Sequence, residues 1–62
     1  MSRQKVLELL RSCPEEHLSG EEIAQRLGLS RAAVWKAVDA LRRDGYTVEA
    51  KPGLGYCLTA AP

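Results

Sequence analysis

Residues 30–36 carry the side chains whose types and spacing offer the clearest chemistry in this sequence. Arg31 can reach a phosphate or a guanine edge with its guanidinium. Ser30 and the free amides of a helix that starts there can bind a phosphate oxygen. Small residues beside them allow close approach, so the stretch favours contact with duplex nucleic acid. The candidate contacts are Ser30, Arg31, Ala32, Ala33, Trp35 and Lys36.

Each of these residues also has an ordinary structural interpretation. Ser30 is well placed to cap a helix, and Arg31 or Lys36 can be simple solvated charges. Trp35 can contact the DNA backbone or a base edge, or it can cover the edge of the core next to the hairpin. The residue types alone leave these alternatives open.

A second group of candidates lies in the proline- and glycine-rich turn 51–55. Lys51 can contact the minor groove or the phosphate backbone. Gly53 lies at the same tip and is included as a candidate contact, although Gly53 and Gly55 are favoured mainly by the turn geometry. This turn would therefore give a second point of contact with the nucleic acid.

The sequence lacks the residue patterns that catalysis or metal binding would need. No nucleophile, base and orienting group occur together, and the glycines of KPGLGY do not lead from a strand into a helix. Cys13 and Cys57 lack metal-ligand spacing, and His17 has no second ligand near it. We therefore expect no enzyme activity, no cofactor, no metal and reduced cysteines in this chain.

Three helices are needed to position these residues, and the hydrophobic periodicity predicts them. Apolar positions over 3–11 form one helical stripe, with Ser2 as its N-cap and Pro14 as its stop. Residues 15–18 connect to the next helix, and Leu18 is a candidate for a very short strand.

The second and third helices are predicted to lie on either side of a very short turn. Ser19 and Glu22 form a capping box that starts the second helix, and Gly28 ends it. Ser30 caps the third helix, which ends at Gly45. The turn Gly28-Leu29-Ser30 between them is typical of a helix-turn-helix. Apolar spacing predicts the core residues of the two helices as Ile23, Ala24, Leu27, Val34, Ala37, Val38 and Leu41.

The rest of the chain is predicted to form a β-hairpin. Residues 46–50 and 56–59 alternate as half-buried strands do, and residues 51–55 form the turn between them. The predicted fold class is α+β, a winged helix-turn-helix of three helices followed by a two-stranded hairpin. Residues 1–59 would form the DNA-binding domain, and residues 60–62 a tail or the start of a linker.

Length and charge limit the function further. The chain has 62 residues, enough for one small domain, and no apolar run approaches the ~20 residues of a membrane helix. The first residues form an amphipathic pattern and no secretory signal, so we expect a cytoplasmic protein. The net charge is +1, but the stretch between Ser30 and Tyr56 contains five basic residues and three acidic ones. This half is the better candidate for contact with a polyanion, although the excess is small.

The pieces HLSGEEIA, LGLSRAAVWKAVDALRRDGY and PGLGYCL resemble the N-terminal domain of the biotin operon repressor/biotin protein ligase family. The resemblance covers about two thirds of the chain. It implies a winged-helix fold and operator binding by a dimer, with biotinyl-AMP as the signal that favours dimerisation. By position it assigns residues 30–33, 35 and 36 to the recognition helix and residues 51–55 to the wing. The family's ligase and dimerisation regions have no counterpart here, so the resemblance implies no biotin chemistry for this chain.

The sequence thus predicts a sequence-specific DNA-binding domain of a transcriptional regulator, and the resemblance implies one of the biotin repressor type. Its expected partner is a double-stranded operator and not a membrane. We expect a monomer in isolation and a dimer on DNA through a domain outside this chain. The alternative is a winged-helix interaction module that packs on a partner domain without touching DNA, which the weak basic excess and Asp39 favour.

Overall fold

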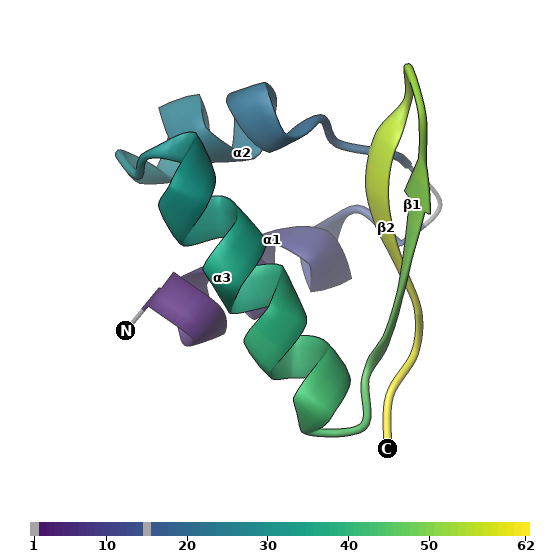
Figure 1. Cartoon of the computed structure of the whole chain (residues 1–62). Helices are drawn as coiled ribbons and strands as arrows, with labels where there is room; N and C mark the ends of the chain where they lie inside the picture. Colours follow the sequence, from purple (N-terminus) through teal and green to yellow (C-terminus); the bar gives the residue numbers. More distant parts are fainter. Residues whose placement is uncertain (1, 15) are drawn as a thin grey trace.

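The fold is three helices followed by an antiparallel hairpin, as the sequence predicted (Figure 1). A computed structural model describes residues 2–14 and 16–62. Glu15, which the sequence places in the first connection, lies outside the described residues. The elements in chain order are α1 (Ser2–Ser12), α2 (Gly20–Leu27), α3 (Arg31–Arg43), β1 (Thr47–Lys51) and β2 (Gly55–Ala60).

Local capping interactions set the ends of α2 and α3. The Ser19 hydroxyl accepts a hydrogen bond from the Glu22 amide at 3.0 Å, and the Ser30 hydroxyl accepts one from the Ala33 amide at 3.1 Å. Gly28 closes α2 in the left-handed conformation, with φ of 67°. These caps occur at the predicted residues and confirm the predicted helix-turn-helix. The sequence could predict them because each cap involves only residues close together in the chain.

The first helix differs from the prediction at its start. Ser2 is already helical, so the prediction that Ser2 is the N-cap was wrong. The helix ends at Ser12, two residues before Pro14, as expected from the proline.

The hairpin is longer than predicted, because its strands pair further towards the tip. Lys51 pairs with Gly55, so both belong to the strands, and the turn contains only residues 52–54. The first strand begins at Thr47 instead of Tyr46, and the second runs to Ala60. We call residues 47–60 the wing.

Leu18 adds a single bridge to the outer edge of β2, which confirms the short strand expected there. Its amide donates to the Tyr56 carbonyl at 2.9 Å, and its carbonyl accepts from the Tyr56 amide at 2.7 Å. The connection between α1 and α2 is thereby tied to the wing.

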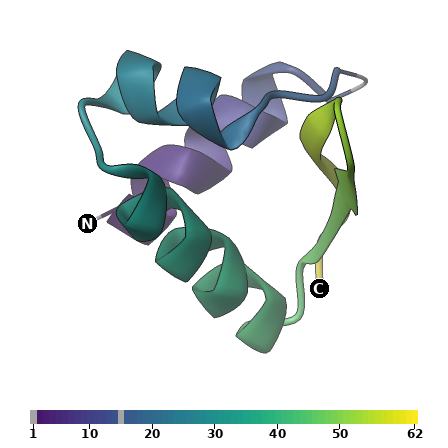
Figure 2. The ribbon, with the colours of Figure 1, turned by 45° about the horizontal axis from the view of Figure 1, so that its top comes forward.

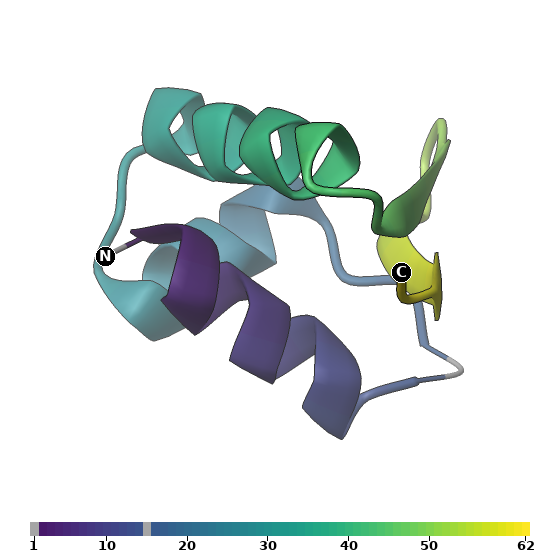
Figure 3. The same cartoon turned by 90° about the horizontal axis from the view of Figure 1, so that it is seen from below.

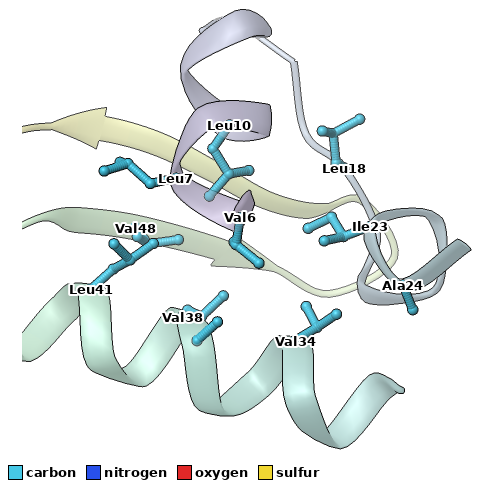
Figure 4. Close-up of a cluster of buried hydrophobic side chains, with 11 residues drawn as sticks. Val6, Leu7, Leu10, Leu18, Ile23, Ala24, Val34, Val38, Leu41 and Val48 are labelled. Carbon is cyan, nitrogen blue, oxygen red and sulfur yellow. The ribbon is translucent and has the colours of Figure 1, made fainter. Parts of the chain in front are cut away.

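One hydrophobic core holds the three helices and the base of the wing together (Figure 4). In the close-up, Val34, Val38 and Leu41 of α3 point towards Val6 of α1 and Val48 of β1. Leu27, predicted to be in this core, is only half-buried and packs against it. The buried residues are Val6, Leu7, Leu10, Leu18, Ile23, Ala24, Val34, Ala37, Val38, Leu41 and Val48.

Because one face of α3 packs against the core, its other face lies on the outside of the molecule. The wing stands beside one end of the helices (Figure 2). Seen from below, α3 and the wing tip lie on the same side, with α1 and α2 on the other (Figure 3).

Candidate nucleic-acid interface

The outer face of α3 presents most of the candidate contacts to solvent. Arg31, Ala32, Trp35 and Lys36 are exposed, and Ala33 is half-buried next to the buried Val34. Trp35 is 59% exposed, so it lies further from the core than its place at the core edge on a helical wheel indicated. A side chain this large and this exposed contributes little to the core and is available for contact.

The start of α3 keeps hydrogen-bond donors for an anion. The Ser30 oxygen is occupied by the Ala33 amide, but the hydroxyl hydrogen can still be donated outward. The first backbone amides of α3 also lack acceptors within the helix, and the helix dipole favours negative charge at this end. Capping and phosphate binding are therefore compatible roles of Ser30.

The basic residues of α3 fall into two groups that the sequence could not separate. Within the part of the chain that the structure describes, Arg31 and Lys36 have no ion-pair partner. Arg43 pairs with Asp39 at 3.0 Å, four residues back on the same helix. Arg42 turns instead to the backbone of β1. The free cations thus lie in the first half of the helix.

The wing tip is open and exposed. Lys51 has an exposed side chain, and its ammonium lies 3.9 Å from a carboxylate oxygen of Glu49, a loose ion pair that water can separate. Gly53 has φ of +80° with nothing within 4 Å of where a Cβ would stand. Leu54, which the sequence did not single out, is 56% exposed beside them. Whether a leucine in a turn is exposed depends on the path of the hairpin, so the amino-acid composition of the turn could not predict the exposure of Leu54.

The connection between α1 and α2 packs against the face of the wing that carries Glu49 and Cys57, which pair with each other across the two strands. His17 contacts the Glu49 carboxylate at 3.1 Å, and the buried thiol of Cys57 donates to the Pro14 carbonyl at 3.5 Å. Both cysteines are free thiols. In residues 2–14 and 16–62 no cluster of three metal-ligating side chains occurs.

Two separate exposed elements, the first half of α3 and the wing tip, therefore lie on one side of the molecule with unpaired or loosely paired cations. The sequence matches the family model described as "HTH domain" over residues 2–57. The chain belongs to this helix-turn-helix domain family.

Curated relatives of this helix-turn-helix domain carry the name "Bifunctional ligase/repressor BirA". The chain is 43% identical over 60 residues to the proteins of Bacillus subtilis and Bacillus spizizenii, covering 97% of this chain. It is 49% identical over 43 residues to that of Salmonella typhimurium, covering 69% of this chain and 13% of that protein. These matches confirm the resemblance drawn from the sequence.

The chain spans 18% of the length of the two Bacillus relatives. The matched region is a helix-turn-helix domain and not a catalytic one, so the word ligase describes the relatives as whole proteins. Among the described residues, no helix has the length and apolar character needed to cross a membrane.

Proposed function

We propose that this chain is the sequence-specific DNA-binding domain of a transcriptional regulator. The observation that carries the proposal is the outer face of α3, where Arg31, Trp35 and Lys36 are exposed and the two cations are free of ion pairs within the described residues. A helix presented in this way fits the major groove with its N-terminal half leading.

Each residue of α3 is suited to a particular part of the duplex. Ser30 and the amides of the first turn bind one backbone phosphate, and Arg31 reads a guanine edge or a neighbouring phosphate. Ala32 and Ala33 have small side chains that let the helix approach the base edges closely. Trp35 offers an apolar surface that can contact a thymine methyl group in the major groove. Lys36 binds a phosphate further along the same strand.

The wing supplies a second contact. Lys51 reaches a phosphate or the adjacent minor groove, and Gly53 at the tip lets the backbone approach closely. Two contact points separated on the duplex fix the register of the helix in the groove, because phosphate contacts position the protein.

The regulator we propose is of the ligase/repressor type named for its relatives, and its operators control biotin genes. Residues 1–59 form the DNA-binding unit, with residues 60–62 as tail or linker. We expect the isolated domain to be a monomer in the cytoplasm. It should bind DNA weakly on its own, since one such module buries only roughly 600–1,000 Å² on DNA. A domain outside this chain would supply dimerisation on a palindromic operator.

Fluorescence anisotropy with a duplex selected from a random pool, and with its scrambled counterpart, tests the proposal. We expect tighter binding to the selected duplex, and a loss of that preference in Arg31→Ala and Trp35→Ala. Arg11→Ala is the matched control, because Arg11 is exposed in the last turn of α1, whose end points away from α3 in Figure 3.

Equal affinity for both duplexes would contradict sequence-specific binding. The double charge reversal Lys36→Glu with Lys51→Glu separates the proposal from a protein-interaction module. Loss of DNA binding with an unchanged fold supports DNA recognition, whereas unchanged DNA binding argues for a module that docks on protein.

A further inference from the structure

The Arg42 side chain joins the last turn of α3 to the first strand of the wing by hydrogen bonds. Its Nη2 donates to the Val48 carbonyl at 2.8 Å, and its Nε donates to the same oxygen at 3.3 Å. Arg42 is exposed as a residue, but the oxygen it binds belongs to the buried Val48. We propose that Arg42 is a positioning residue that fixes the angle of the wing relative to α3, and that it does not contact DNA itself.

The bond reaches the wing at a point that is itself anchored. Val48 is 5% exposed and belongs to the hydrophobic core. A second bond closes the connecting segment, from the Tyr46 amide to the Leu41 carbonyl at 3.0 Å. The Arg42 fork adds a contact two residues further along, so β1 and the segment before it are bonded to α3 at two successive points.

A small change of angle at Val48 would move the wing tip appreciably. Lys51 lies three residues beyond Val48, or about 10 Å at 3.3 Å per residue. A tilt of about 10° would displace Lys51 by about 2 Å, which exceeds the tolerance of a hydrogen bond to a phosphate. Holding this angle therefore decides whether α3 and Lys51 reach the duplex together.

The neighbouring Arg43 shows what an arginine without this role looks like. Its side chain is 80% exposed, and among residues 2–14 and 16–62 its ion-pair partner is Asp39 on its own helix, four residues back. Both arginines carry the same charge at the same end of α3, so replacing Arg43 is the matched control for replacing Arg42.

This inference rests on the proposed function for its DNA readout, and a double-mutant cycle tests it. Affinity for the selected duplex is measured for the 62-residue chain with Lys51→Ala, Arg42→Ala and both. In the parent chain Lys51→Ala weakens binding several-fold; in the Arg42→Ala background we expect almost no further loss. In the Arg43→Ala background, Lys51→Ala should keep its full effect. Independent, multiplying effects of Arg42→Ala and Lys51→Ala would overturn the inference.

A second readout on the free protein does not depend on DNA. The ¹⁵N heteronuclear NOE of amides 49–55 should fall in Arg42→Ala and stay unchanged in Arg43→Ala. Unchanged wing dynamics in Arg42→Ala contradict the positioning role even if no duplex is ever bound. If Arg42→Ala does not fold, Arg42→Lys takes its place, because it retains the charge and one donor nitrogen but loses the two-nitrogen fork. An intermediate loss of wing order is then expected, and full wing order contradicts the inference.

Discussion

At the scale of single residues, the glycines of the wing have different reasons for being glycine. Gly55 has φ of +118°, and a Cβ there would stand 2.3 Å from the backbone carbonyl carbon of Leu18. Gly53 also has a positive φ, but the space around it is open. Only Gly55 therefore serves a close approach of two backbone segments, the one that brings Leu18 against Tyr56.

We expect Gly55→Ala to lower the free energy of unfolding by at least about 2 kcal/mol, because the left-handed backbone is strained and the methyl group displaces the Leu18 segment. Gly53→Ala should cost only about 1 kcal/mol, from the backbone conformation alone. Urea unfolding followed by circular dichroism compares the two. Equal losses would show that the contact with Leu18 is not what requires Gly55.

At the scale of elements, the same capping interaction begins α2 and α3, yet only one cap lies on the proposed DNA side. Ser19 and Ser30 each accept a bond from the amide three residues ahead. Near Ser19 the Glu22 carboxylate pairs with Arg26 at 2.8 Å, whereas Ser30 is followed directly by Arg31, which is free of ion pairs within the described residues. The Ser19 cap is thus followed by an ion pair within α2, whereas the Ser30 cap is followed by donors that are available to an anion.

Ser19→Ala and Ser30→Ala should each reduce stability by about 1 kcal/mol, since each removes one N-cap. Only Ser30→Ala should also weaken DNA binding, by several-fold, when measured well below the unfolding temperature of both variants. Thermal unfolding and anisotropy on the same samples give the two quantities. If Ser19→Ala weakens binding as much, the effect of Ser30 comes from helix stability and not from a phosphate contact.

At the scale of the whole molecule, the capacity to bind DNA depends less on the number of cations than on which cations are free of partners within the protein. The net charge is only +1. Arg43 is paired with Asp39 and Arg42 is bonded to the wing, so three cations are left for DNA on the α3 and wing side: Arg31, Lys36 and Lys51.

With three phosphate-neutralising cations per domain, the logarithm of the binding constant should fall against the logarithm of salt with a slope of about −2.7. Lys36→Ala should reduce the size of that slope by about 0.9, and Arg11→Ala should leave it unchanged. Anisotropy titrations across a salt series measure this. A slope near −4.5, as five contacts would give, would mean that Arg42 and Arg43 leave their partners on DNA.

The helices, the N-caps of α2 and α3, the short turn between them and the core face of α3 could be predicted from the sequence alone. Each depends on residues within about one helical turn of one another, such as Ser30 with Ala33 or Val34 with Val38. The candidate contacts followed from the same local pattern, because the face opposite a predicted core face must point outward.

Only the tertiary structure decided which arginine of α3 holds the wing, how far Trp35 stands from the core, and why Gly55 must be glycine. These properties arise where segments distant in the chain meet, as Gly55 meets Leu18 across the edge of the sheet. When a side chain has several possible partners, the distances in the folded protein determine which one it contacts. Distances between separate elements are fixed only when the core packs.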